Sequence, residues 1–328
     1  MMASSTHAVR MHQTGGPEVL RWEKVELPPP GAGEIRVRHT AIGLDFIDTY
    51  YRTGLYPLAL PAVLGSDAAG VVEELGAGVT LVNKGDRVAY GNGPAFGYAE
   101  LRNIPAAHVV KIPDAVDDAT AAASMLKGMT AQYLCRRTYA VKKGDSILVH
   151  AAAGGVGHIL CQWAKHLGAT VIGTVGSEEK AKLAREHGCD HVLFYRTEDV
   201  AARVREITGG ERVPVVYDSV GKDTFLTSLD CLRPRGLMVT FGQSSGPVGP
   251  IDPRLLAQKG SLFLTRPTLN DYVRARAELE ATARELFEII ASGAVRVRIG
   301  QTYPLRDAER AHRDLEARRT MGATVLLP

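Results

Sequence analysis

The sequence predicts an α/β protein with two parts, a β-rich domain and a doubly wound parallel sheet. The chain has 328 residues, more than one hydrophobic core usually fills. Up to about residue 120 it alternates as short strands broken by turns, and beyond that strands alternate with helices of about ten residues. At residues 147–157, ILVHAAAGGVG runs from an apolar strand into a glycine-rich turn, and a helical pattern follows directly. The helix–strand alternation thus continues through this turn.

Composition narrows the class of protein. Hydrophobic residues make up 45% and charged residues 23%, with a net charge of +3, which is ordinary for a globular protein and too weakly basic to indicate nucleic-acid binding. No apolar run approaches the roughly 20 residues of a membrane span, and the N-terminus has no secretory pattern. Four widely spaced cysteines without a C-x-x-C pair indicate a reducing, cytoplasmic location; those at 161 and 231 fall in predicted helices, where buried thiols are expected.

The first part of the chain is expected to be mostly β. Its segments 34–44 (EIRVRHTAIGL), 68–76 (AAGVVEELG) and 86–91 (DRVAYG) alternate in the manner of strands, and Pro- and Gly-rich turns separate them.

The second part begins with an Ala-rich helix over 119–137. The expected strands are SILVHAA, TVIGTVG, HVLFY, VPVVYDSV and LMVTFGQ, and the helices between them cover 156–167, 178–187, 199–208 and 222–232. Gly168 and Gly188 stand where a left-handed residue ends a helix, and Ser177 stands where one begins. This pattern predicts βαβ units and a parallel sheet.

After residue 243 the alternation stops. A Ser/Gly/Pro-rich loop leads to a helix over 271–291, a strand RVRIG (296–300), a helix over 307–319 and a last strand over 323–328. We expect this tail to pack on the β-rich domain. That domain would then be discontinuous, covering 1–122 and 265–328, with the parallel-sheet domain covering 123–264.

The glycine-rich turn predicts a dinucleotide site. At a helix N-terminus, unpaired N–H groups and the helix dipole face an anion, and glycines let the backbone approach a pyrophosphate. The fingerprint G-x-G-x-x-G is incomplete here, since its register places Ala152, Gly154 and Gly157. An alanine at the first position requires only an ordinary φ there.

The end of the second strand favours NADPH over NADH. NAD sites usually carry an Asp or Glu at this point to bind the ribose 2′-hydroxyl. Here the strand ends in Thr-Val-Gly followed by Ser177, and Lys180 follows within the first helical turn. A hydroxyl and an ammonium suit a 2′-phosphate, while the neighbouring Glu178 and Glu179 are explained as partners of the helix dipole. Tyr195 and Arg196 follow the third strand, where they could cover the adenine and add positive charge. For Arg196 the alternative is an ordinary solvated arginine on the surface.

No metal site is expected. A catalytic zinc needs Cys and His converging near residues 43–48 and 64–68, and these segments read GLDFID and LGSDA. His187, Cys189 and His191 straddle a helix end and a strand start, which makes convergence on one metal awkward. No nucleophile motif is present either, so the cofactor itself is expected to carry the chemistry.

Several motifs together give the chain a family resemblance. It resembles the zinc-independent quinone oxidoreductases, the ζ-crystallin-like branch of the medium-chain dehydrogenase/reductase superfamily, and among these the bacterial NADPH:quinone reductases. The resemblance runs essentially from end to end and rests on GGPEVL, FIDTYYRTGLYP, LKGMTAQYL, HAAAGGVG, CQWAKHLGA, YDSVG, LDCLRPRGLMV and KGSLFLTRP. It implies a GroES-like β-rich catalytic domain and a Rossmann doubly wound nucleotide-binding domain, NADPH between them, and a homodimer.

The resemblance also implies roles for individual residues. Tyr50 and Tyr56 resemble tyrosines of the substrate cleft, and Lys127 and Thr130 resemble residues beneath the nicotinamide ribose and phosphates. The other residues implied at the cofactor are Gly154, Gly155, Val156 and Gly157 (pyrophosphate), Ser177, Lys180 and Tyr195 (2′-phosphate pocket), Ser219, Phe241, Gly242, Phe263 and Leu264 (nicotinamide), and Arg318.

Asp45 departs from the family pattern, which typically has Asn in GINFIDTY. An amide donates and accepts hydrogen bonds, whereas an ionised carboxylate only accepts. Three explanations stay open: Asp45 keeps a contact to a hydroxyl, Asp45 is protonated near the cofactor, or the cleft of this protein differs from that of the family. It stays among the expected cofactor-binding and catalytic residues.

The expected reaction is transfer of hydride from NADPH to a quinone or similar conjugated carbonyl, with single-electron transfer as an open alternative. Positioning in an apolar cleft walled by Tyr50, Tyr56 and Phe263 would supply most of the rate. The proton comes from either tyrosine, from Asp45 or from water.

Two other functions compete with this expectation. One is reduction of an activated C=C bond in an enal or enone with the same parts. The other is RNA binding by the basic C-terminal helix, whose arginines at 310, 313, 318 and 319 are interleaved with acidic residues. That interleaving favours a solvated face over a nucleic-acid patch.

Overall fold

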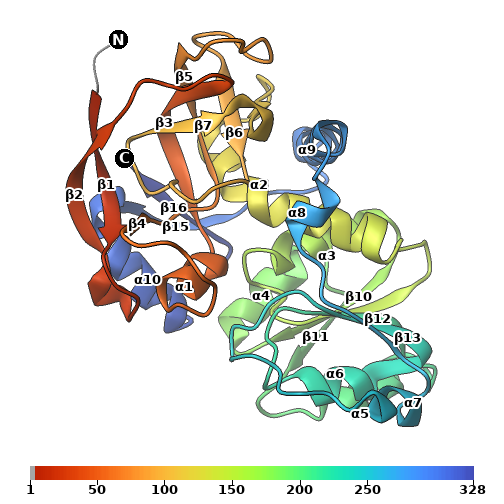
Figure 1. The fold of residues 1–328 in the computed structure, drawn as a ribbon. Helices are drawn as coiled ribbons and strands as arrows, with labels where there is room; N and C mark the ends of the chain where they lie inside the picture. Colours follow the sequence, from red (N-terminus) through yellow and green to blue (C-terminus); the bar gives the residue numbers. More distant parts are fainter. Residues whose placement is uncertain (1–3) are drawn as a thin grey trace. The chain divides into compact units, whose positions relative to one another are not determined.

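The structure, a computed structural model, describes residues 4–328. By contacts the chain divides into two compact units, here called the first and second unit. Among the described residues, the first unit comprises 4–129, Val273–Ser292 and Val297–Pro328, and the second comprises Thr130–Tyr272 and Gly293–Arg296. In Figure 1 the first unit carries the red, orange and deep-blue parts of the chain.

The first unit is built on two sheets. The larger has the strand order β15-β16-β3-β5-β6-β8, with β7 also paired to β3, and the smaller has the order β2-β1-β4. The strands are β1 (Ser4–Met11), β2 (Arg21–Leu27), β3 (Glu34–Leu44), β4 (Ala62–Val63), β5 (Ala68–Leu75), β6 (Arg87–Tyr90), β7 (Leu101–Pro105), β8 (Val110–Lys111), β15 (Ile299–Pro304) and β16 (Ala323–Leu327). The strands predicted over 34–44, 68–76 and 86–91 are thus confirmed.

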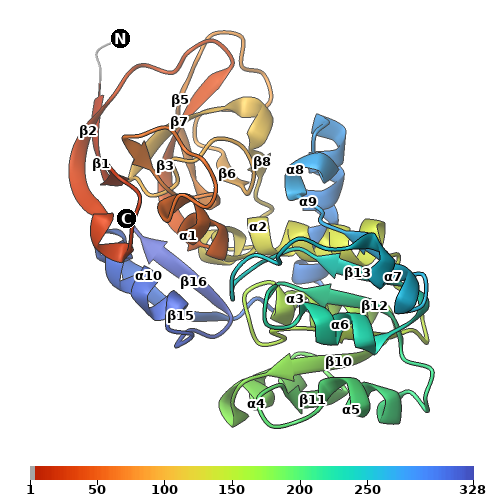
Figure 2. The ribbon, with the colours of Figure 1, turned by 60° about the horizontal axis from the view of Figure 1, so that its bottom comes forward.

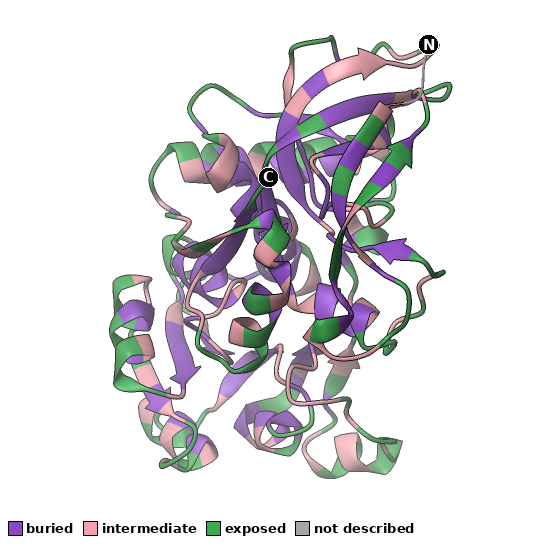
Figure 3. Cartoon of the chain, turned by 90° about the vertical axis from the view of Figure 1, so that its left-hand side faces the viewer, coloured by how far each residue is buried: buried purple, intermediate pink, exposed green. Residues whose placement is uncertain are grey.

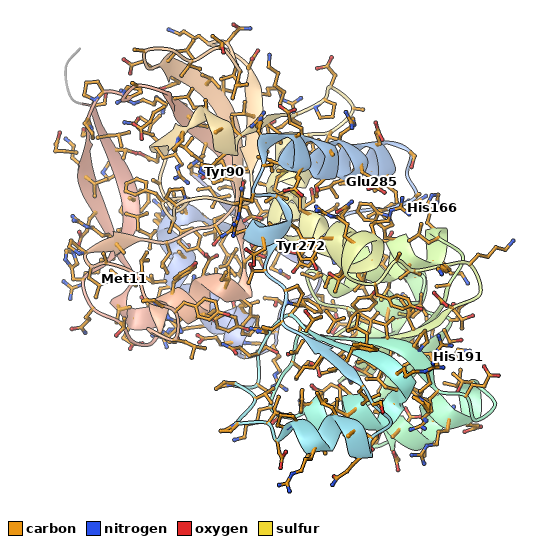
Figure 4. The ribbon with its side chains drawn as sticks, turned by 45° about the vertical axis from the view of Figure 1, so that its right-hand side comes forward. Met11, Tyr90, His166, His191, Tyr272 and Glu285 are labelled. Carbon is orange, nitrogen blue, oxygen red and sulfur yellow. The ribbon has the colours of Figure 1, made fainter. Side chains whose placement is uncertain are left out.

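The C-terminal stretch returns to this sheet, as predicted. Strand β16 pairs antiparallel with β3 and parallel with β15. Around the sheets lie α1 (Phe46–Arg52), α9 (Arg276–Ala291), α10 (Ala308–Glu316) and most of α2 (Asp118–Tyr133). The core of this unit is apolar and includes the fully buried Met11 and Tyr90, which are labelled in Figure 4.

The second unit is a six-stranded parallel sheet in the order β11-β10-β9-β12-β13-β14, and Figure 2 shows its helices along it. The strands are β9 (Ser146–Val149), β10 (Thr170–Val175), β11 (His191–Phe194), β12 (Val213–Asp218), β13 (Leu232–Thr240) and β14 (Phe263–Thr265). The helices are α3 (Gly157–His166), α4 (Glu178–Glu186), α5 (Val200–Ile207), α6 (Phe225–Cys231), α7 (Pro253–Gln258) and α8 (Leu269–Tyr272). This confirms the doubly wound sheet.

The strand order of this sheet reverses between β9 and β12, where connections leave the sheet in opposite directions. In doubly wound sheets ligands bind at such a switch point, beside the carboxyl ends of the strands. Figure 3 shows that buried residues, in purple, concentrate on the strands, while loops are largely exposed. By this rule the loops after β9 and β12 form the edge where a ligand is expected.

Three predicted elements have different bounds. The helix expected over 271–291 is broken, because the Glu278 carboxylate accepts the N–H of Ala275 and starts α9 there. The strand expected over 296–300 starts at Ile299, because both backbone groups of Arg296 are hydrogen-bonded to the Gln162 side chain. The Ala-rich helix continues past Tyr133 only as a wider turn, where Tyr217 donates to the carbonyl of Leu134.

Other local predictions are confirmed. Gly168 and Gly188 have φ of 86° and 91°, and the Ser177 side chain caps α4. All four cysteines are free and buried.

One helix was not predicted. The short helix α1 lies in a part of the chain expected to hold strands and turns only. Within residues 4–328, no helix is long and apolar enough to cross a membrane.

Candidate active site

The glycine-rich turn after β9 forms the start of helix α3. Its strained position is Ala151, with φ of 52°, while Ala152 keeps an ordinary φ as predicted. The Gly154 N–H donates to the Ala151 carbonyl at 2.8 Å. A Cβ on Gly157 would lie closer than 3.0 Å to that carbonyl oxygen, so glycine is required there. Val156 is the N-cap residue and makes no side-chain cap. The N–H groups of His158 and Leu160 donate to the carbonyls of Gly154 and Val156 at 3.0 and 2.9 Å, so an anion bound at this helix start would meet the amides of the preceding turn.

The end of β10 offers hydroxyl and amine groups. Ser177 is exposed and accepts the Lys180 N–H at 3.4 Å, which places the Lys180 side chain in the first turn of α4. The Tyr195 hydroxyl lies beside Gly176, where a Cβ would be 2.8 Å away. Glu178 and Glu179 are exposed on the same turn, where they complement the helix dipole. The strand tip itself has no carboxylate.

The loops after β12 and β13 lie side by side at the same edge. Phe241 donates its N–H to the Asp218 carbonyl at 2.9 Å, and Ser244 donates to the Ser219 carbonyl at 3.2 Å. Gly242 packs on Ser219 so closely that a Cβ would lie 2.5 Å from its carbonyl oxygen. The structure thus brings Ser219, Phe241 and Gly242 together at this edge.

A buried polar network fixes this edge. The Ser228 hydroxyl lies 3.0 Å from His150 Nε2 and 2.8 Å from Asp218 Oδ2, and His150 Nδ1 lies 2.9 Å from the Thr174 hydroxyl. Burial lowers the pKa of His150, which keeps the imidazole neutral. Because the serine sits between the other two and all are buried, this network positions the strand ends and is not a nucleophilic triad.

Phe263 and Leu264 lie on β14, the outermost strand of this sheet. Phe263 is 62% exposed, and Leu264 packs partly against the core. Within the second unit, Phe263 therefore presents its ring to the surface.

Helix α1 of the first unit carries an aromatic cluster. The Tyr50 and Tyr56 rings are 5.3 Å apart in an edge-to-face arrangement, and Tyr51 lies 5.8 Å from Tyr56. Phe46 lies 6.0 Å from Tyr50. Tyr50 is buried and Tyr56 half-buried. The two tyrosines expected to wall the substrate cleft are thus in contact with each other.

Beside α1 lies a buried cluster of three carboxylates and one ammonium, here called the carboxylate–lysine cluster: Asp45, Asp48, Asp67 and Lys127. Lys127 Nζ is 2.8 Å from Asp45 Oδ1 and 3.8 Å from Asp67 Oδ2. The nearby carboxylates raise the pKa of Lys127 against the effect of its burial. Asp45 precedes α1 but does not cap it with its side chain; its N–H donates to Asp48 Oδ2 at 3.0 Å.

A chain of buried hydrogen bonds continues from Asp48. The Tyr98 hydroxyl donates to Asp48 Oδ2 at 3.0 Å and lies 3.1 Å from His312 Nε2. Arg52 donates to His312 Nδ1 at 3.0 Å and pairs with Glu316 at 2.6 Å. Because arginine only donates, the His312 proton is on Nε2 and points to Tyr98. Burial and Arg52 lower the pKa of His312 to about 3, so it is neutral.

The remaining predicted residues lie elsewhere. Thr130 is buried on α2, one turn beyond Lys127. Arg318 is exposed just after α10, with φ of 59°. On that helix Arg310 pairs with Asp314 and Arg313 with Glu309, so the positive charges alternate with negative ones.

Within residues 4–328, no group of three or more His, Cys, Asp or Glu is arranged to hold a metal ion. Of the three residues weighed for a metal, His191, labelled in Figure 4, is exposed, whereas Cys189 is buried against Gly173.

The residue patterns did not reveal Asp48, Asp67 and the network around Asp218. Segments 43–48 and 64–68 carry no Cys or His, and their aspartates meet in the structure around Lys127. The signal in the sequence was a single acidic residue, Asp67, inside the apolar stretch VLGSDAAG, since a buried charge usually has a partner.

Comparison with known proteins shows relatives that are similar to this chain over nearly its whole length. Residues 31–114 match the alcohol dehydrogenase GroES-like domain and residues 155–289 match the zinc-binding dehydrogenase family. A quinone oxidoreductase of Pseudomonas aeruginosa is 55% identical over 96% of this chain and 97% of its own length. A 2-haloacrylate reductase of a Burkholderia species is 49% identical over 98% of both chains. The crystal structure of Escherichia coli quinone oxidoreductase complexed with NADPH has a TM-score of 0.97 and 49% identity, covering 99% of this chain and 100% of that one.

The Pseudomonas aeruginosa relative matches 96% of this chain, and the two domain families together match segments of both units. The chain therefore belongs to the quinone oxidoreductase family of the medium-chain dehydrogenase/reductase superfamily.

Proposed function

We propose that the protein is an NADPH-dependent reductase of quinones or similar conjugated carbonyl compounds. The observation that carries the cofactor choice is the end of β10, which has no carboxylate at its tip and is followed by Ser177 and Lys180, with the Tyr195 hydroxyl, from the residue after β11, beside Gly176. A carboxylate there would repel a 2′-phosphate, while a hydroxyl and an ammonium favour it. The family membership and the NADPH complex of the Escherichia coli relative support the same choice.

The residues of the second unit fit a dinucleotide. The Gly154–Gly157 turn and the uncapped α3 N-terminus would hold the pyrophosphate, and the side chains after β10 and β11 would hold the 2′-phosphate. Ser219, Phe241, Gly242, Phe263 and Leu264 would border the nicotinamide, with Lys127, Thr130, Asp45, Tyr50 and Arg318 as further contacts. When bound, NADPH supplies the hydride, and the protein supplies position and surroundings.

The first unit would hold the acceptor and its proton. The rings of Tyr50 and Tyr56 form an apolar wall with two hydroxyl groups, which suits a flat conjugated ring. A reduced carbonyl oxygen needs a proton, and Tyr50, Tyr56 or Asp45 would donate it from this wall or hold the water that does.

The test is turnover of NADPH with 1,4-benzoquinone, with an alkenal and with 2-chloroacrylate. Rapid oxidation with the quinone, and slower oxidation with NADH, is the expected result. The second candidate is reduction of an activated C=C bond, favoured by the 49% identity to the 2-haloacrylate reductase. Consumption of the alkenal or haloacrylate alone would replace the quinone assignment by this one.

We also propose that the protein is a cytoplasmic homodimer. Four free, buried cysteines suit a reducing compartment. Strand β14 is an edge strand that carries the exposed Phe263, and an open apolar edge favours pairing with a second copy. Light scattering should give twice the 35.3 kDa chain mass, and Phe263→Lys should lower it to one chain. A wild-type protein with the mass of one chain would contradict the dimer.

A further inference from the structure

Four buried polar side chains of the second unit form a line of hydrogen bonds, here called the Thr174–Asp218 chain. Thr174 lies at the end of β10, His150 follows β9, Ser228 lies on α6 and Asp218 ends β12. Each is at least nine-tenths buried. Contacts of 2.9, 3.0 and 2.8 Å join them in that order. The chain therefore connects the carboxyl ends of three neighbouring strands at the point where the sheet reverses its order.

The direction of each hydrogen bond in this chain follows from its Asp218 end. The carboxylate only accepts, and it takes four hydrogen bonds, from the N–H groups of Val220 and Gly221 and from the hydroxyls of Thr224 and Ser228. Because Ser228 gives its one hydrogen to Asp218, His150 must donate to it from Nε2. Burial lowers the pKa of His150, and a neutral imidazole has a single N–H. Its Nδ1 is therefore the acceptor of the Thr174 hydroxyl hydrogen.

Thr174 contacts the residues on both sides of the strained Ala151. Its hydroxyl donates to the His150 ring, and its carbonyl accepts the N–H of Ala152 at 3.1 Å. Between these two contacts Ala151 has a φ of 52°, a left-handed conformation that an alanine adopts at a cost and a glycine adopts freely. A residue persists in such a conformation only when its surroundings determine it. The Ala151 carbonyl then accepts the Gly154 N–H and begins the glycine-rich turn.

We propose that the Thr174–Asp218 chain holds Ala151 in its left-handed conformation and thereby positions the glycine-rich turn for the pyrophosphate of the cofactor. The second half rests on the proposed function, because it takes this turn as the pyrophosphate site. Thr174, His150 and Ser228 are positioning residues here, since they act through the backbone of the turn and not on the cofactor itself.

The Asp218 carboxylate holds a second loop as well. Its Oδ1 accepts the N–H groups of Val220 and Gly221 at 2.7 and 3.0 Å, in the loop where Ser219 packs on Gly242. A change at Asp218 would thus disturb both loops at this edge. Ser228 bonds only to His150 and Asp218, so a change there breaks the chain and leaves the loop after β12 with its backbone hydrogen bonds.

The first experiment determines the direction of the chain without cofactor or substrate. Nitrogen-15 NMR at pH 7 distinguishes a protonated from an unprotonated ring nitrogen, and His150→Gln identifies the His150 signals among those of the ten histidines. We expect a protonated Nε2 and an unprotonated Nδ1. A protonated Nδ1, in the other neutral form or in the cation, would overturn the proposed direction.

The second experiment measures the NADPH dissociation constant at a temperature where each variant is folded. Thr174→Val keeps the shape of the side chain and removes the hydroxyl, and Ser228→Ala breaks the chain at its centre. Both should raise the constant by roughly tenfold, because binding must then restore the conformation of the turn. Thr174→Ser keeps the hydroxyl and should stay within about threefold of the wild type. Equal losses in Thr174→Ser and Thr174→Val would overturn the role of the hydroxyl.

The matched control is Thr208→Val, in the same unit. The Thr208 hydroxyl also bridges two backbone groups, the carbonyl of Val204 and the N–H of Arg212. It does so just before β12, at the opposite end of that strand from Asp218. This variant should lose stability and keep its NADPH dissociation constant within about twofold of the wild type. A rise as large as that in Ser228→Ala would show a general loss of stability and overturn the positioning role.

The third experiment tests the link to the strained residue. In an Ala151→Gly background the left-handed conformation carries no penalty, so the chain has less to hold. Ser228→Ala should then raise the NADPH dissociation constant by less than about threefold, against roughly tenfold alone. The same factor in both backgrounds would overturn the link. Failure of the wild type to bind NADPH would refute the proposed function and with it the positioning role, whereas the direction of the chain would still be decided by the nitrogen spectra.

Discussion

Replacement of Gly157 by alanine tests the geometry of the phosphate turn. The new Cβ would lie closer than 3.0 Å to the Ala151 carbonyl oxygen and 3.0 Å from the carbonyl carbons of Ala151 and Ala152. Ordinary contacts begin at 3.4 Å, so the backbone of the turn or of α3 must move by about 0.4 Å to clear the two carbonyl carbons and farther to clear the carbonyl oxygen. All of these neighbours are backbone atoms, and no flexible side chain can give way.

The cost follows from two opposing effects. Overpacking of this kind costs about 1–3 kcal/mol, and the better helix propensity of alanine returns up to about 1 kcal/mol. Taking the middle of the first range, about 2 kcal/mol, less about half of the alanine gain, we expect a net loss of roughly 1.5 kcal/mol in the stability of the protein without cofactor. Displacement of the α3 amides should also raise the NADPH dissociation constant by roughly 10- to 100-fold.

The assay is thermal unfolding without cofactor, followed by NADPH titration. Gly154→Ala is the matched control, because its Cβ would meet only the Ala151 carbonyl oxygen, at 3.1 Å, and the Ala151 Cβ, at 3.8 Å. It should unfold near the wild-type temperature. The reasoning is refuted if Gly157→Ala unfolds at the wild-type temperature, or if the two variants are destabilised equally.

Three further predictions concern charge and buried polarity. Lys180→Glu should raise the KM for NADPH by roughly 10- to 100-fold while changing the KM for NADH little; equal losses in a two-cofactor assay would sink the 2′-phosphate assignment. Tyr98→Phe leaves Asp48 without one donor and His312 without its acceptor, so chemical denaturation should show a loss of about 1–3 kcal/mol; an unchanged midpoint would contradict this. Burial lowers the pKa of His39 to about 3, so its neutral form stabilises the fold above pH 6.5, and that stability is lost as pH falls toward 3. The wild type should therefore lose about 3 kcal/mol more than His39→Gln between pH 6.5 and 4, measured by denaturation at both pH values; parallel losses would show that His39 does not titrate in this way.

The parallel-sheet unit was largely predictable from the sequence, because its signals are local. Gly168, Gly188 and Ser177 mark helix ends through their own backbone preferences, and the structure has each in that role. Periodicity likewise identified the five strands from β9 to β13. Element bounds failed where a distant side chain intervened, as Gln162 does at Arg296.

The site in the first unit was predictable only in part. Asp45, Tyr50 and Lys127 were identified through the family resemblance, and Asp45 was recognised as a departure from it. Asp67 became visible only in the structure, because its partner Lys127 lies 60 residues further along the chain and no local pattern links the two. Contacts of that kind depend on the register between elements, which sequence periodicity does not specify.

The hydrogen-bond chain from Asp48 through His312 to Glu316 has a consequence for how the protein is made. Arg52 and its partners are separated by 260 and 264 positions in the sequence. During synthesis, α1 emerges long before the residues that pair with its arginine, and strand β3 must likewise wait for β16. Contacts of such long sequence separation form late and slow folding. The N-terminal stretch therefore leaves the ribosome with Arg52 still unpaired, and the first unit is completed only after α10 and β16 have been made.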